Sequence, residues 1–340
     1  MTGISLHAAR TARLSPEATL AGLCLLYVLA AFAVAPACYP LVLFEYAKMM
    51  ATVLPALLPI VILLLGILRN PQSPLSGTRA TLRDSLIPGL AVIAVFLLAI
   101  SAFTTLKFSI PSIVPFYADP MLANLDETLH GAAPWRLAHA VSPDWMPAAI
   151  GFLYARFWFI QWLGMLALVA FWGDRTQRAR YLWSFALTVG IVGTLLATLL
   201  SSVGPILYDQ FYEGRRFSGL LDALNASKDG GIVVGYADYL LESYRAATPR
   251  FATGISAMPS MHVAVAVLNA LFLARLNRWA GVYGWLFAAA ILFGSVWTGW
   301  HHAVDGYVSI VVVSLIWWAS GRALAADAPG ATCPAAPAGR

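Results

Sequence analysis

The feature that most limits the fold of this chain is a series of apolar runs, each close to the length that crosses a bilayer. They cover residues 18–36, 50–68, 85–106, 150–172, 181–203, 257–274, 279–298 and 303–320. A helix satisfies its own backbone polar groups, which a segment in lipid must do. We therefore predict an all-α, polytopic membrane protein with about eight transmembrane helices. Only 11% of the residues are charged, against about 25% in soluble proteins.

Basic residues between the runs predict the orientation. With the N-terminus inside, the inner segments hold twelve of them. These are Arg10, Arg13, Arg69, Arg79, Arg83, Arg175, Arg178, Arg180, Arg275, Arg278, Arg322 and Arg340. Apart from the long segment 204–256, the outer segments hold only Lys48, Lys107 and Arg136. Because positive charge concentrates on the cytoplasmic side, both termini are expected in the cytoplasm. The net charge of +5 arises in these short segments and does not indicate a nucleic-acid partner.

The run at 18–36 also has an interpretation as a secretory signal, because Ala35-Pro36-Ala37-Cys38 resembles a cleavage site. A signal core spans about 7–15 apolar residues, so we favour an uncleaved helix. We divide the chain into three parts. Residues 1–149 are N-terminal transmembrane helices with an outer amphipathic segment, 150–322 a catalytic membrane domain, and 323–340 a disordered tail rich in Ala, Pro and Gly.

One outer segment, residues 107–149, is too long for a simple turn. The spacing of Met121, Leu122, Leu125 and Leu129 predicts a short amphipathic helix in the membrane interface. We favour a surface anchor for this helix, and the alternative is a lid over the lipid entrance.

Two polar motifs open the sixth and eighth runs. The first reads Ala257-Met258-Pro259-Ser260-Met261-His262, and the second Gly299-Trp300-His301-His302-Ala303-Val304-Asp305. The four-residue spacing of His301 and Asp305 places both on one helix face, where a carboxylate can hold an imidazole in one tautomer. The charge count puts both motifs on the outer side, so they are expected to form one site.

These motifs resemble those of the type 2 phosphatidic acid phosphatase superfamily, which carries Pro-Ser-Gly-His and Ser-Arg-x5-His-x3-Asp. Here Met261 replaces the glycine of the first motif, and His301-x3-Asp305 matches the end of the second. The Pro-Ser-Met-His and His-His versions look most like the branch with inositol phosphorylceramide synthases. The resemblance covers roughly residues 180–320.

The resemblance implies roles for the motif residues. His301 would attack phosphorus and become phosphohistidine, Asp305 would orient it, and His262 would protonate the leaving group. Ser260 and nearby backbone N–H groups would hold phosphate oxygens at the start of a helix, although Ser260 is also a favoured helix cap. His302 is expected to be structural, yet it is three residues from Asp305 and is kept as an alternative nucleophile.

The sequence departs from the family at its phosphate-binding cations. Ser295 stands where the second motif has arginine, and the family's Lys-x6-Arg-Pro motif is absent because the chain has no Arg-Pro pair. Candidates to replace these cations are Arg215, Arg216 and Arg156. The last has an alternative interpretation as an arginine that snorkels to the interface. Weaker phosphate binding also leaves room for a non-catalytic relative.

The resulting prediction is an integral membrane enzyme, of the bacterial inner-membrane type, that acts on a lipid phosphoester at the periplasmic face. Phosphohistidine would pass its phosphoryl group to an alcohol, including inositol-phosphoryl or other head-group transfer, or to water. The water reaction would make it a lipid phosphate or prenyl pyrophosphate phosphatase. A transporter or lipid-binding protein is the alternative of another class. Neither a carboxylate cluster nor a cysteine spacing predicts a metal site, so we expect no cofactor.

Overall fold

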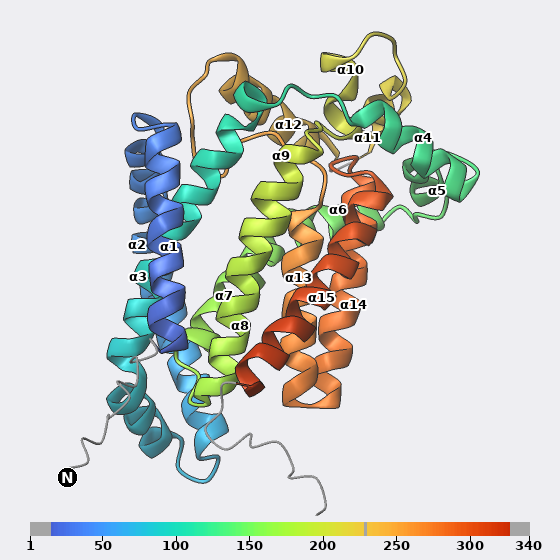
Figure 1. Ribbon diagram of the computed structural model, residues 1–340. Coiled ribbons are helices and arrows are strands. Elements are labelled where there is room, and N and C mark those ends of the chain that lie inside the picture. The colour runs from blue at the N-terminus through green and yellow to red at the C-terminus, as the bar shows by residue number, and fades with distance from the viewer. Residues whose placement is uncertain (1–14, 228–229, 327–340) are drawn as a thin grey trace, which may run out of the picture.

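The computed structural model describes residues 15–227 and 230–326, and every regular element in these ranges is helical (Figure 1). Most of the predicted tail, from residue 327 onward, lies outside the described residues. The long helices stand side by side as a bundle, and short helices gather at one end of it.

Within the described residues, six helical segments are long and apolar enough to cross a membrane. They are α1 (Pro16–Val34), α2 (Cys38–Arg69), α3 (Pro74–Ile113), the Arg175–Leu199 segment, α14 (Arg278–Trp297) and α15 (Ala303–Ala326). Two further apolar helices, α7 (Trp158–Ala170) and α13 (Met261–Leu276), have 13 and 16 residues. The predicted helical membrane protein is therefore confirmed, whereas the count of eight spans and the orientation stay predictions.

Two helical segments of the bundle contain π-helical turns, which are wider than α-helical ones. The Arg175–Leu199 segment consists of α8 (Arg175–Leu187), η2 (Thr188–Leu196) and α9 (Ala197–Leu199). Helix α7 likewise continues α6 (Met146–Phe152) through η1 (Leu153–Phe157). Both π-helical turns border the functional site described below.

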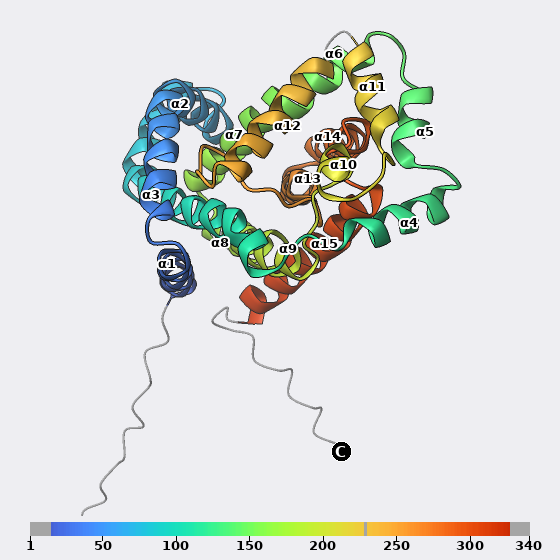
Figure 2. The ribbon, with the colours of Figure 1, turned by 90° about the horizontal axis from the view of Figure 1, so that it is seen from above.

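Helix α13 lies at the centre of the part of the bundle that contains the histidine motifs (Figure 2). Ten of its 16 residues are buried. Its buried Asn269 donates to Gln161 of α7 at 2.9 Å and accepts from the Tyr181 hydroxyl of α8 at 2.6 Å. Such side-chain hydrogen bonds join helices in an environment where apolar surface alone gives no reason to associate.

Helices α13 and α14 approach each other closely at Gly284 of α14. A Cβ built at Gly284 would lie 2.7 Å from the Ala270 Cα, so a larger residue at position 284 would force the backbones apart. This contact fixes the spacing of the two helices that precede and follow the histidine motifs.

Short elements cover the end of the bundle at the top of Figure 1. They are α4 (Asp119–His130), α5 (Pro134–Ala140), the 3₁₀ turn η3 (Pro205–Leu207), α10 (Tyr208–Phe211), α11 (Ser218–Ala226) and α12 (Gly230–Arg245). The loops that carry both histidine motifs lie beneath these elements.

The predicted short helix in segment 107–149 is present as α4, but its apolar residues do not share one face. Met121, Leu125 and Leu129 are exposed, whereas Leu122 is buried together with Asp119 and Asp126. The first three recur every four residues, so they occupy a different face from the buried three. Helix α4 thus turns its acids inward and an apolar stripe outward.

Candidate active site

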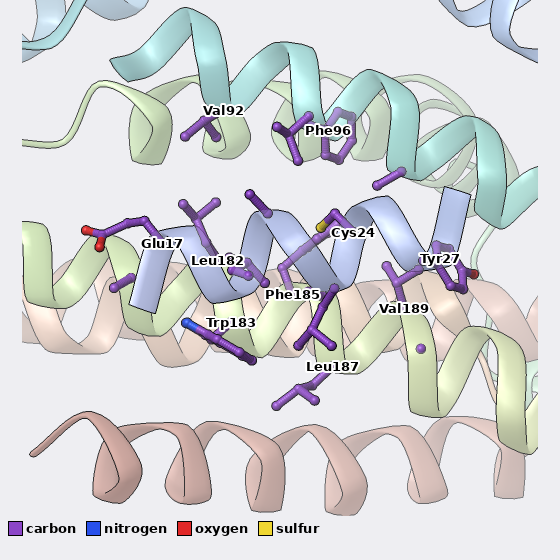
Figure 3. A pocket seen from close by; sticks show the side chains of 18 of the residues that line it. Glu17, Cys24, Tyr27, Val92, Phe96, Leu182, Trp183, Phe185, Leu187 and Val189 are labelled. Atoms are coloured by element: carbon purple, nitrogen blue, oxygen red, sulfur yellow. The ribbon is translucent and has the colours of Figure 1, made fainter. Parts of the chain in front are cut away.

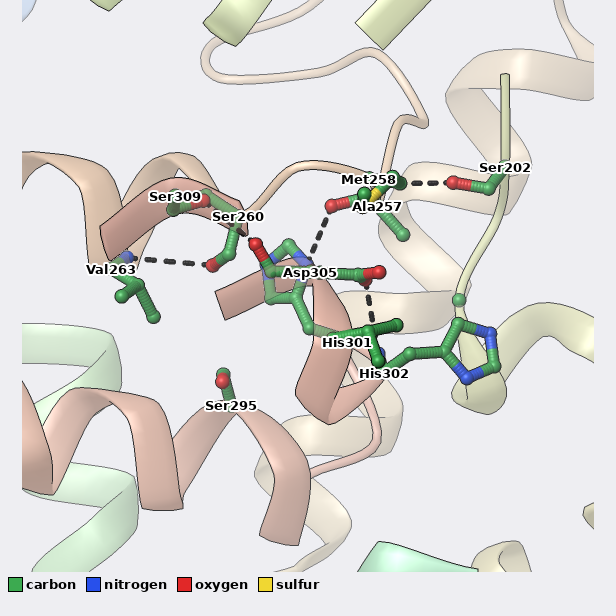
Figure 4. Close-up of polar contacts among 12 residues, drawn as sticks. Ser202, Ala257, Met258, Ser260, Val263, Ser295, His301, His302, Asp305 and Ser309 are labelled. Atoms are coloured by element: carbon green, nitrogen blue, oxygen red, sulfur yellow. Dashed lines mark hydrogen bonds and ion pairs between the residues drawn. The ribbon is translucent and has the colours of Figure 1, made fainter. Parts of the chain in front are cut away.

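Three loops meet at the covered end of the bundle (Figure 4). They contain residues 200–204 after α9, 246–260 before α13 and 298–302 between α14 and α15. Ser202 joins the first two, because its carbonyl accepts from Ala257 N at 3.0 Å and its hydroxyl from Met258 N at 2.9 Å. Ile206 N donates to the Gly299 carbonyl at 2.8 Å. Backbone pairing therefore fixes the motif loops against each other.

Gly204 allows one of these approaches. Its φ is 82°, in the region that favours glycine. A Cβ there would collide with the carbonyl oxygen of Trp300, next to the candidate nucleophile. The loop that contains His301 therefore packs directly on the Gly204 backbone, and a larger residue at position 204 would displace it.

His301 is held mainly by a backbone group. Its Nδ1 lies 2.7 Å from the Ala257 carbonyl oxygen and 3.4 Å from Asp305 Oδ2. A carbonyl oxygen only accepts, so Nδ1 carries the hydrogen in this contact and Nε2 keeps its lone pair. Sequence spacing predicts Asp305 as the orienting partner, but the carbonyl is closer. The carboxylate also accepts from His302 N at 3.0 Å, so Asp305 holds the loop as well as the ring.

His262 lies in the first turn of α13, with its ring centroid 6.2 Å from that of His301. Its ring stacks on Tyr154 of η1 at 4.5 Å and packs against Trp158 at 4.3 Å. The Trp158 indole N–H also donates to the His262 carbonyl at 3.1 Å. The structure therefore brings His262, His301 and Asp305 together, as their sequence motifs predict.

His302 points away from His301 (Figure 4). It is 2% exposed. Its Nε2 lies 3.5 Å from Asp119 Oδ1 and its Nδ1 3.8 Å from Asp126 Oδ2. The His302 pKa lies above its ordinary value of 6.5: burial lowers it, but the carboxylates, led by Asp119, raise it by more. This environment favours the structural role that the sequence predicts for His302.

The acids of α4 hold the motif loops, and sequence reasoning did not identify them. Asp119 accepts from Val203 N at 2.8 Å and Gly204 N at 2.7 Å. Asp126 accepts from Ala303 N at 2.7 Å and Val304 N at 3.0 Å, and so caps α15. Burial raises the pKa of Asp126. The available signal was two acids seven residues apart, on one face of a helix that is otherwise partly apolar. The backbone groups that they bind lie far away in sequence.

The residues predicted to bind phosphate lie at different distances from the histidines. Ser260 is fully buried, and its hydroxyl accepts from Val263 N at 3.4 Å, so it caps α13. Arg216 pairs with Glu127 at 3.0 Å, and Glu127 lines a cavity of about 10 Å³ that also borders His301. Arg215 and Arg156 are exposed, the latter on η1. Of the three arginines, Arg216 is tied most directly to the site.

Lys107 is a cation that the sequence reasoning used only to assign sidedness. It is half-buried near the end of α3 and packs against Gly254, in the loop that leads to the first histidine motif. An ionisable residue within an apolar helix is by itself a reason to expect function. Among residues 15–227 and 230–326, no group of three or more His, Cys, Asp or Glu side chains is arranged to hold a metal ion.

Comparison with known proteins gives one match. A family model described as the PAP2 superfamily matches residues 120–319, from the first turn of α4 into α15. Neither a curated protein nor a solved structure matches the chain.

Proposed function

Because this chain belongs to the PAP2 superfamily, whose membership indicates phosphatase or phosphotransferase chemistry, we propose that it transfers a phosphoryl-type group from a membrane lipid through a phosphohistidine at His301. The single observation that carries this proposal is the contact between His301 Nδ1 and the Ala257 carbonyl at 2.7 Å. It leaves Nε2 as the atom with a free lone pair, in a ring that lies against His262.

The first step forms a bond between His301 Nε2 and phosphorus and breaks the bond from phosphorus to the leaving oxygen. His262 gives its proton to that oxygen. The Ala257 carbonyl and the Asp305 carboxylate stabilise the N–H at Nδ1 as positive charge develops on the ring. In the second step, His262 takes a proton from water or an alcohol, and the resulting oxygen attacks phosphorus and releases His301.

The phosphate oxygens need positive partners, because the family's arginine is replaced by Ser295. We assign this role to Lys107 on the His262 side and Arg216 on the His301 side, together with free N–H groups at the start of α13. Arg216 would exchange Glu127 for the substrate. Ser260 would act by capping α13, which fixes the direction of those N–H groups. Arg215 and Arg156 remain weaker candidates because both are exposed.

Trapping the intermediate tests the proposal. The purified protein is mixed with a panel of lipid phosphates, prenyl pyrophosphates and inositol phospholipids, quenched, digested under alkaline conditions that preserve phosphohistidine, and mapped by mass spectrometry. We expect the added group on His301, with none after His301→Ala. Labelling of His302 would overturn the assignment. Absence of both label and turnover with every substrate would favour the alternative of a non-catalytic lipid-binding protein or transporter.

The same panel distinguishes transfer from hydrolysis. The resemblance to the inositol phosphorylceramide synthase branch favours transfer, so we expect a new lipid product when an alcohol acceptor such as a ceramide or diacylglycerol is present. Release of inorganic phosphate at the same rate with and without acceptors would indicate a lipid phosphate or prenyl pyrophosphate phosphatase.

We further propose that the site faces the periplasm in a bacterial inner membrane, which rests on the distribution of basic residues. In a background without native cysteines, Arg245→Cys on α12 should react with a membrane-impermeant thiol reagent in intact cells. Arg175→Cys at the start of α8 should react only after the membrane is opened. The opposite pattern would place the site in the cytoplasm.

A further inference from the structure

A second cavity lies inside the bundle, away from the histidines. Its volume is about 560 Å³, and it runs along α1 from Glu17 to Tyr27 (Figure 3). Helices α3 and α8 and the π-helical turn η2 form its other walls. Its lining is apolar except for a few groups, mainly Glu17 and Arg178 near one end and Tyr27 at the other.

The cavity lies between two points at which α1 is attached to the bundle. At one end the Trp183 indole N–H donates to the Pro16 carbonyl at 3.2 Å. At the other, the hydroxyls of Tyr27 and Thr194 lie 2.6 Å apart. Between these contacts the helices do not pack closely, and a Cβ built at Gly190 would meet no atom within 4 Å. The cavity thus occupies the stretch between the two contacts that attach α1 to the bundle.

An apolar space of this size in a membrane protein favours an apolar occupant over water. Water needs polar partners, which the walls do not offer. A water molecule takes about 30 Å³ in the liquid and a methylene group is of similar size, so the volume of about 560 Å³ has room for roughly one long acyl chain. The cavity is elongated along helices that we expect to span the bilayer, which is the direction in which lipid chains lie.

We propose that this cavity binds one acyl chain of a bilayer phospholipid, with the lipid phosphate at Arg178. Arg178 lines the cavity beside the first turn of α1 and forms no ion pair with any residue in 15–227 or 230–326. Trp183 lies at the same end, where indole groups favour the interface between headgroups and chains. The lipid is a resident one, in a site separate from the one that carries out the chemistry.

The position of η2 gives this lipid a structural consequence. Val189, Gly190 and Ile191 of η2 line the cavity, whereas Gly193 on the next turn packs close to Met261 of the histidine motif. A lipid in the cavity therefore supports η2, which packs against the first residue of α13. The lipid contributes to the stability of the catalytic end without taking part in the reaction.

Photo-crosslinking tests the proposal. The full-length protein is reconstituted in vesicles of phosphatidylglycerol that carry a trace of the same lipid with a diazirine in the acyl chain, irradiated, and mapped by peptide mass spectrometry. We expect crosslinks concentrated on residues 18–27 and 178–191. Gly190→Leu fills the cavity and should lower these crosslinks about tenfold, which corresponds to about 1.4 kcal/mol of binding free energy. Gly22→Leu, on the exposed face of α1 and outside the lining, is the matched control and should change nothing.

Arg178→Gln keeps the proposal testable if Gly190→Leu fails to fold. We expect it to lower crosslinking by the phosphatidylglycerol probe several-fold and to leave crosslinking by a diacylglycerol with the same diazirine chain unchanged. Crosslinks spread evenly over all lipid-facing helices, with no difference between either variant and the Gly22→Leu control, would overturn the proposal.

Discussion

Helices α13 and α1 are both apolar, yet they occupy opposite extremes of packing. Ten of the 16 residues of α13 are buried, against a single one, Ala31, among the 19 of α1. Hydrophobicity does not separate the two, because lipid receives an apolar side chain as readily as a protein interior does. Small residues do not separate them either, because both helices contain several alanines. What separates them is a polar residue of α13, Asn269, which has two hydrogen-bond partners on neighbouring helices. In this protein, the closely packed helix is the one that carries residues of the candidate active site.

The sharpest test of this contrast removes the nucleophile. We expect His301→Ala to lower kcat by about 10⁴-fold or more, as loss of a catalytic group does in other enzymes, with little change in thermal stability. Gly22→Leu in α1 should leave kcat unchanged. Activity with the preferred lipid substrate, measured beside a melting curve, checks both. An active His301→Ala protein and an inactive His302→Ala protein would exchange the roles assigned to the two histidines.

The buried acids of α4 give the next largest effect. Asp126→Ala removes the acceptor for two N–H groups of α15 and leaves the His302 ring without one of its carboxylates. We expect a loss of about 3–5 kcal/mol in stability, the usual result of breaking a buried charged pair. Asp222→Ala on the exposed face of α11 is the control. Chemical unfolding in micelles measures the difference, and equal stability of the two variants would show that Asp126 does not hold the loop.

A matched pair of substitutions tests the packing contrast directly. Gly284→Leu places a side chain where the Cβ alone would lie 2.7 Å from Ala270 Cα, and we expect it to cost about 1–3 kcal/mol by overpacking. Gly22→Leu meets no atom within 4 Å at its Cβ and should be neutral. If both variants melt at the wild-type temperature, the α13–α14 contact is looser than the structure has it.

The smallest expected effect is a dependence of stability on pH, and it should arise only at the catalytic end. The His302 pKa is raised in the folded protein, by Asp119, Asp305 and Asp126 against the effect of burial. The protonated ring therefore stabilises the fold fully below its ordinary value of 6.5, and this contribution is lost as pH rises through the raised value. We expect the melting temperature to fall as the pH rises above about 6.5 and through the raised pKa of His302. The fall should be smaller in His302→Gln, and an unchanged slope in that variant would assign the effect to another group.

Much of this fold follows from the apolar runs, but their ends do not. Helix α2 begins at Cys38 rather than near residue 50, and α3 at Pro74 rather than near 85. The extensions contain charged residues that form exposed pairs, Lys48 with Glu45 within α2 at 3.1 Å and Arg69 of α2 with Asp84 of α3 at 2.6 Å. Hydropathy predicts only the part of a helix that lies in lipid. The helix itself extends as far as its backbone hydrogen bonds continue, which can be beyond the apolar run.

The part of the candidate site that could be predicted consists of the side chains in the two histidine motifs. His262, His301 and Asp305 come together as their motifs indicate. The Ala257 carbonyl was not predictable as the nearest partner of His301, because a backbone acceptor has no sequence signature. Asp119 and Asp126 were not predictable either, since their partners lie at residues 203–204 and 303–304. A pattern in one segment carries no information about which distant loop it will meet.

The π-helical turns η1 and η2 have a consequence for how this architecture can be altered. A π-helical turn holds one more residue than an α-helical turn, and one residue rotates a helix face by about 100°. The residues that contact the first histidine motif lie within these turns: Tyr154 of η1 stacks on His262, and Gly193 of η2 packs close to Met261. A substitution that converts Leu153–Phe157 or Thr188–Leu196 to a regular α-helix would therefore shift the contacts of the first histidine motif as well as the register of the helix.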